Sequence, residues 1–169
     1  MHFLLNKGGL YKVYNGNLLY HGCVPLKEDG NLKSVRIFGH TYKGKGLYEV
    51  LESYVRKGFY AMDSKEKERG KDIMWYIWLS ENSPLFGKDK MATFERYFLA
   101  EKETHKEKKN PYYLLLEDEK VICHILKEFG LENKDAHIIN GHVPVKCKDG
   151  EKPIKCGGKV LVIDGGFSR

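Results

Sequence analysis

Two histidines follow short apolar segments in similar sequence contexts. His142 follows the apolar residues of AHIINGHVPV (136–145), and His21 follows those of NLLYHGCVP (17–25). Pro144 cannot donate a hydrogen bond to a sheet, so the first segment is predicted to be a short strand that stops near His142. Ligands and metals collect at strand ends in sheet-based enzymes, and imidazoles are common metal ligands. Both histidines are therefore candidate metal ligands, although spacing alone leaves an ordinary loop position open for each.

A second segment that could do chemistry is GHTYKGKG (39–46), which nearly fits the phosphate-binding pattern GxxxxGK[ST]. It lies between a predicted strand and a predicted helix, as phosphate-binding loops do. However, Gly46 stands where the pattern needs a hydroxyl for magnesium. One alternative function is therefore a basic nucleotide- or nucleic-acid-binding module that uses Gly39 to Lys45, and the simpler interpretation is a loop that leads into the helix.

The composition indicates about one domain with an anionic partner. A chain of 169 residues that is 41% hydrophobic can bury a core. A net charge of +6 and a pI near 9.0 suit a phosphorylated metabolite or a nucleic acid. No apolar run approaches membrane-spanning length and no secretory signal is recognisable, so a cytoplasmic location is expected. The four cysteines have no CxxC spacing and are expected to be reduced thiols.

The pattern of elements predicts a mixed α/β unit in which several strands end in loops at one shared edge. The clearest local signal is Leu10 to Gly22, where Asn15-Gly16 between two strand-like runs favours a type I′ hairpin. Further strands are predicted at 34–38, 136–139 and 159–164, and helices at 45–57, 91–99 and 117–129.

One glycine and two segments carry more specific expectations. Gly58 is expected to end the helix that begins at Lys45. The alternating charges of DSKEKERGKD (63–72) indicate a solvated face. The apolar run IMWYIWL (73–79) is expected to be buried as a core helix or strand.

Several segments together are similar to one enzyme family. They are NGNLLYHGCVPL, SPLFGKDKMATFERYF, KETHKEKKNPYY, INGHVPVK and KVLVIDGGFS, which cover most of the chain. The chain resembles the class III fructose-1,6-bisphosphatases of bacteria, which belong to the calcineurin-like metallophosphoesterase superfamily. YHGCVP and NGHVPV resemble two of the metal motifs of that superfamily.

The resemblance implies a function and a site. It implies that His21 and His142 are ligands of one ion in a two-metal site, with Mn²⁺ as the expected metal. It also implies hydrolysis of fructose 1,6-bisphosphate to fructose 6-phosphate and phosphate, as in gluconeogenesis. The expected partner is the sugar bisphosphate, without nucleic acid or membrane, and assembly into a homo-oligomer is left open.

Some motifs of the superfamily are missing from this chain. An upstream DxH, a GDxxDRG and a GNHE supply the other ligands in the superfamily, and none lies in its expected place here. Asp135-Ala136-His137 spells DxH, but it opens a predicted strand instead of ending one. Residues 1–169 are therefore expected to be one unit, a fragment with a partial calcineurin-like fold that is inactive alone.

Substrate contacts are predicted from a more distant similarity. Trp78 to Asn82 is similar to a stretch that precedes a phosphate-binding arginine in related protein phosphatases. Arg96 and Lys90 are therefore candidate substrate-binding residues, since an arginine fork suits phosphate. A surface position for Arg96, paired with Glu95 or Glu101, is the alternative. A further alternative function is a phosphatase that acts on phosphoproteins or dinucleoside polyphosphates.

Overall fold

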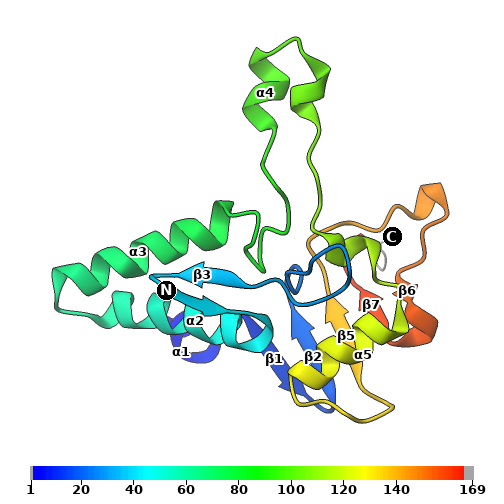
Figure 1. Cartoon of the computed structure of the whole chain (residues 1–169), viewed down its shortest axis with the longest axis horizontal. Coiled ribbons are helices and arrows are strands. Elements are labelled where there is room, and N and C mark those ends of the chain that lie inside the picture. Colours follow the sequence, from blue (N-terminus) through cyan, green and yellow to red (C-terminus); the bar gives the residue numbers. More distant parts are fainter. Residues whose placement is uncertain (1, 166–169) are drawn as a thin grey trace.

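Five short strands form one mixed sheet in the order β1-β2-β5-β7-β6 (Figure 1). The structure is a computed structural model that describes residues 2–165, so the last residues of KVLVIDGGFS lie outside the described range. The strands are β1 (Tyr11–Tyr14), β2 (Asn17–Tyr20), β5 (His137–Asn140), β6 (Ile154–Lys155) and β7 (Val160–Val162).

The three central strands, β2, β5 and β7, run parallel to one another, whereas the two outer strands are antiparallel to their neighbours. The carboxyl ends of parallel strands meet at one edge of a sheet. The shared edge and the mixed α/β class predicted from the sequence are therefore confirmed.

The hairpin of β1 and β2 forms as its turn residues predict. Asn15 and Gly16 have φ values of 47° and 73°, the positive pair that a type I′ turn requires. β2 pairs with β5 on its other side, with Leu18 opposite Ile138. The hairpin thus places the end of β2 beside the end of β5.

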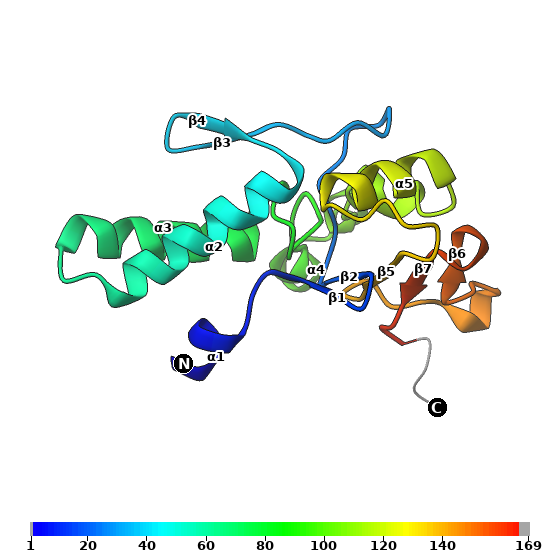
Figure 2. The same ribbon diagram turned by 90° about the horizontal axis from the view of Figure 1, so that it is seen from below.

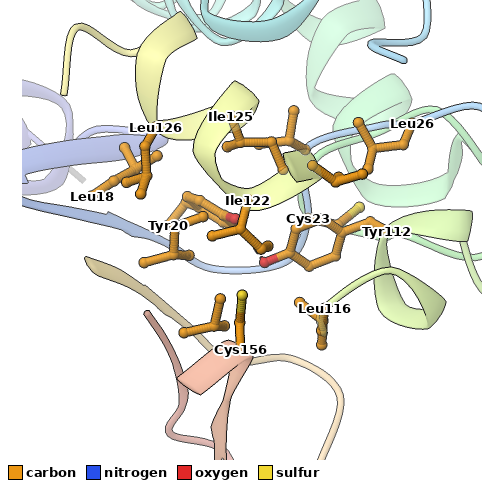
Figure 3. Close-up of a cluster of buried hydrophobic side chains, with 14 of the residues drawn as sticks. Leu18, Tyr20, Cys23, Leu26, Tyr112, Leu116, Ile122, Ile125, Leu126 and Cys156 are labelled. Atoms are coloured by element: carbon orange, nitrogen blue, oxygen red, sulfur yellow. Dashed lines mark hydrogen bonds between the residues drawn. The ribbon is translucent and has the colours of Figure 1, made fainter. Parts of the chain in front are cut away.

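Helix α5 (Glu119–Glu128) covers one face of the sheet (Figure 2). The Asp118 carboxylate accepts hydrogen bonds from the first turn, and Gly130 follows the helix with a φ of 82°. The apolar side chains along one face of α5 are buried and include Ile122 and Ile125, which pack in one cluster with Leu18 (Figure 3). Each such side chain contributes about 1.5–3 kcal/mol by its burial.

Helices α2 (Gly44–Tyr60) and α3 (Ser64–Leu79) pack side by side beyond one end of the sheet (Figure 1). The prediction that Gly58 ends the first helix is wrong, because α2 continues to Tyr60. A Cβ atom at Gly58 would lie 2.5 Å from the Cα of Gly70. The glycine therefore allows the two backbones to approach, and does not mark a helix end.

The expectation that residues 73–79 are buried is correct for only part of the segment. Ile73 and Ile77 are buried against α2, but Trp75 and Trp78 are 64% and 68% exposed. Consecutive residues of a helix point in different directions, and α3 has a packing partner on one side only, so a continuous apolar run cannot be buried there. Residues 63–72 are mostly exposed, as predicted.

The segment that nearly fits a phosphate-binding loop is part of a β-hairpin. β3 (Val35–Ile37) pairs with β4 (His40–Tyr42), and the turn between them has positive φ at Phe38 and Gly39. The N-terminus of α2 already has an anion, because the Lys45 amide donates to a Glu128 carboxylate oxygen at 3.2 Å. This geometry does not support phosphate binding by Gly39 to Lys45.

A long excursion leaves the fold after α3 and returns before α5. It carries α4 (Thr93–Phe98) and the short helix η1 (Lys102–His105), and its two arms meet at a bridge between Lys88 and Lys109. Figure 1 shows α4 at the far end of the excursion, away from the sheet. The short helix η2 (Pro111–Leu114) follows its return.

The remaining elements are short. They are α1 (His2–Lys7), η3 (Cys147–Asp149) and η4 (Cys156–Gly158). Cys23, Cys123 and Cys156 are free thiols, as predicted for these three. Within residues 2–165, no helix is long and apolar enough to cross a membrane.

Candidate metal centre

The two candidate histidines meet at the carboxyl edge of the sheet. His21 directly follows β2, and His142 lies two residues after β5, which is the neighbouring parallel strand. Although they are 121 positions apart in sequence, His21 Nε2 lies 3.0 Å from His142 Nδ1. Two nitrogens at this separation are close enough to bind one ion, because metal–nitrogen bonds are about 2.0–2.1 Å long.

Two hydrogen bonds between the two strand ends hold this pair. The Gly141 amide donates to the His21 carbonyl at 2.9 Å, and the buried Asn140 side-chain amide donates to the Gly22 carbonyl at 3.1 Å. His142 itself has a φ of 69°, which is unfavourable for a residue with a Cβ atom. Strained backbone of this kind is found most often at functional sites, where surrounding contacts maintain it.

The tautomer of His142 follows from a second hydrogen bond. Its Nε2 lies 2.8 Å from the backbone carbonyl oxygen of Phe86. A carbonyl oxygen only accepts, so Nε2 carries the proton and Nδ1 has the free lone pair. His21 Nε2–H then donates to that lone pair in the structure. A histidine that donates one N–H to a carbonyl and offers the other nitrogen is the usual arrangement of a metal ligand.

The electrostatic setting also favours the neutral form of His142. Burial lowers its pKa below the ordinary value, and the neighbouring His21 and Lys88 lower it further. The Phe86 carbonyl and the carboxylate of Asp164 act on this pKa in the opposite direction. Because burial is the largest of these effects, the imidazole remains available to a cation near neutral pH.

The remaining donors near the pair are few. Burial raises the pKa of Cys23 to about 12, so its thiol stays protonated and is a poor metal ligand. In the part of the chain that the structure describes, no three His, Cys, Asp or Glu side chains gather closely enough to hold a metal ion. The two imidazoles thus fit a divalent metal, but as a partial set of ligands.

Comparisons with known proteins show the family to which the chain belongs. The family described as Firmicute fructose-1,6-bisphosphatase matches residues 1–169. The chain belongs to this family. It is 59% identical over 168 residues to the fructose-1,6-bisphosphatase class 3 of Clostridioides difficile (strain 630), and 56% identical to those of Clostridium acetobutylicum and Clostridium botulinum (strain Hall).

The match covers most of this chain but only a small part of each relative. It spans 99% of this chain but 25% of each of these relatives, so the chain spans about a quarter of their length. No solved structure matches the chain.

The predicted substrate-binding residues of this member of the fructose-1,6-bisphosphatase family do not lie at the histidine pair. Arg96 lies on α4, where its guanidinium is 3.5 Å from a Glu107 oxygen. The Lys90 ammonium donates to the Thr104 carbonyl at 2.7 Å. Both cations thus bond within the excursion, and Arg96 pairs with Glu107 instead of Glu95 or Glu101. Their role in substrate binding stays a prediction.

His137 lies at the other end of β5 from His142. Its Nδ1 contacts the Asn17 side-chain oxygen at 3.1 Å. Asp135-Ala136-His137 therefore opens β5 instead of ending it, as the sequence predicted.

Sequence reasoning missed two contributors to the site. Phe86 acts through its backbone carbonyl, so its side-chain type contains no signal of the role. Asp164 lies two residues after β7, and the parallel register of Asn140 with Val162 continues toward His142 and Asp164. A polar residue shortly after an apolar strand was the available signal for Asp164.

Proposed function

We propose that this chain forms part of a fructose-1,6-bisphosphatase, which hydrolyses fructose 1,6-bisphosphate to fructose 6-phosphate and phosphate. The observation that carries the proposal is the His21–His142 pair at the carboxyl edge of the sheet, in a chain of this family. The curated relatives bear the name of this activity. A cytoplasmic location and assembly into homo-oligomers belong to the same proposal.

His21 would hold a divalent metal, with Mn²⁺ as the proposed ion, through Nε2 once the proton of that nitrogen has moved to Nδ1, and His142 would hold it through Nδ1. When bound in a two-metal site, such ions supply a hydroxide nucleophile and stabilise the phosphoryl oxygens. The chain's own contribution is to keep His142 neutral and to orient both imidazoles. The Phe86 carbonyl fixes the proton of His142 at Nε2, and the Asn140 contact holds the two strand ends together.

Other donors are needed for a complete centre. Mn²⁺ prefers carboxylate and other oxygen ligands, and two neutral imidazoles do not offset the charge of the ions. We therefore propose a calcineurin-like metallophosphoesterase fold in which carboxylates from outside residues 1–169 complete the site. Residues 1–169 alone should then release no phosphate above the background rate with Mn²⁺, and full turnover would contradict this part of the proposal.

A chimera tests the function of the chain directly. Residues 1–169 would replace the matched quarter of the Clostridioides difficile relative, and phosphate release from fructose 1,6-bisphosphate would be measured with Mn²⁺. We expect an active chimera that His21→Ala or His142→Ala inactivates. His124→Ala is a matched control, because His124 is exposed on α5 and should leave activity unchanged.

The chimera also separates the proposal from its alternative. Activity that survives both His21→Ala and His142→Ala would refute the proposed metal site. Turnover of phosphoproteins or dinucleoside polyphosphates without turnover of the sugar bisphosphate would instead favour the related phosphatase activities.

A further inference from the structure

A tight turn from Ser83 to Gly87 connects the end of α3 to the excursion and presents the Phe86 carbonyl to His142. Ser83 is fully buried in this turn. Its hydroxyl donates to the Ile77 carbonyl in the last turns of α3. The same oxygen accepts hydrogen bonds from the amides of Leu85 at 3.1 Å and Phe86 at 3.3 Å. The Ser83 side chain thus connects the end of α3 to the Leu85–Phe86 peptide group, which lies next to the Phe86 carbonyl.

The turn is also fixed on the side of β2. The Pro84 carbonyl accepts a hydrogen bond from the Cys23 amide at 2.9 Å. The Gly87 amide closes the turn by donating to the Ser83 carbonyl at 3.2 Å. These contacts leave the turn little freedom, so the direction of the Phe86 carbonyl is set by the turn as a whole.

We propose that Ser83 is a positioning residue for the metal ligand His142. By shaping the turn, its hydroxyl directs the Phe86 carbonyl to His142 Nε2–H and thereby leaves Nδ1 unprotonated. Without this contact the proton can occupy Nδ1, and it must then be displaced before this nitrogen can bind a metal. The benefit to metal binding rests on the proposed function, whereas the control of the His142 tautomer does not depend on it.

The first test observes the tautomer in the metal-free protein. In ¹⁵N-labelled chain, NMR should show a His142 Nε2–H signal that exchanges slowly with water. Ser83→Ala should weaken or remove this signal. Ser80→Ala is the matched control, since the Ser80 hydroxyl also accepts a backbone N–H, from Asn82 at 3.3 Å, whereas the Phe86 amide donates to Ser83.

A second variant separates the hydrogen bonds of Ser83 from the space that it fills. Ser83→Cys keeps nearly the same size, but a thiol is only a weak donor and acceptor. If the hydroxyl directs the turn, Ser83→Cys should lose the Nε2–H signal as Ser83→Ala does. A wild-type signal in Ser83→Cys would show that only packing is involved and would overturn the proposal. Circular dichroism of each variant confirms that it is folded.

The third test uses Zn²⁺ alone as the probe of the site, measured by calorimetry on the whole chain. Ser83→Ala should bind Zn²⁺ about tenfold more weakly, the lower end of the effect of losing an outer partner of a metal ligand. A Zn²⁺ affinity and an Nε2–H signal both equal to the wild type would overturn the inference. Zn²⁺ binding that is insensitive to His21→Ala and His142→Ala would refute the metal site. The role of Ser83 in fixing the His142 tautomer would still be tested by the NMR signal of the metal-free protein.

Discussion

Gly22 is the residue at which a small change should disturb the site most. It follows His21, and its Cα faces the turn that presents the Phe86 carbonyl. A methyl group added here would overlap the Pro84 carbonyl oxygen and lie 3.0 Å from the Leu85 carbonyl oxygen. Both are backbone atoms, so they cannot move away without moving the turn.

The size of the effect follows from these distances. The Pro84 oxygen must retreat by about 1 Å to reach ordinary contact distance with the new methyl group. If the same shift reaches Phe86, its 2.8 Å bond to His142 Nε2 lengthens to about 3.8 Å and is lost. We expect Gly22→Ala to weaken Zn²⁺ binding about 10- to 100-fold, and to lower the free energy of unfolding by about 1–3 kcal/mol through overpacking.

Calorimetry with Zn²⁺ and urea unfolding measure the two quantities. Gly46→Ala is the control, because a Cβ atom there meets nothing within 4 Å and lies in the first turn of α2. It should leave Zn²⁺ affinity unchanged and raise stability by up to about 1 kcal/mol. A folded Gly22→Ala protein that binds Zn²⁺ within about twofold of the wild type would refute the reasoning, because losing the outer partner of a metal ligand should cost at least about tenfold in affinity.

Three further predictions follow from the same structure. Because the pKa of His142 is lowered in the folded state, its contribution to stability should be full above pH ~6.5 and should be lost as the pH falls through the folded pKa. Urea unfolding of the wild type and of His142→Gln between pH ~5 and ~8 checks this. The plot of unfolding free energy against pH should have a different slope in the two proteins. Asp164→Asn should weaken Zn²⁺ binding about tenfold, less so at high salt, whereas Asp135→Asn at the other end of β5 should have no effect in the same titrations. Gly58→Ala should cost about 1–3 kcal/mol in thermal unfolding by forcing Gly70 away, and an unchanged melting temperature would contradict the close helix contact.

Local sequence signals were sufficient to predict the elements whose conformation depends mainly on their own residues. Asn15-Gly16 predicted the hairpin turn, and the apolar spacing within residues 117–129 predicted α5. In both cases the backbone preference and the burial pattern indicate the same structure. The shared strand edge followed in turn from the apolar segments that precede His21 and His142.

Features that depend on contacts between segments could not be predicted. The exposure of Trp75 depends on α3 having a packing partner on one side only, which its own sequence does not record. Gly58 has the residue type of a helix end, but its role is set by Gly70 on another helix. The carbonyl that contacts His142 belongs to the backbone of Phe86, and any residue that leaves the turn intact could supply it. The residue type at this position therefore could not predict the contact.

The central claim is that His21 and His142 bind one cation together. The most direct measurement is NMR of the ¹⁵N-labelled chain during titration with one equivalent of Zn²⁺. The account predicts that the signals of His21 Nε2 and His142 Nδ1 shift together and reach saturation at one equivalent, while the ring of exposed His124 does not respond. A response from one ring alone, or saturation with both rings unchanged, would contradict it.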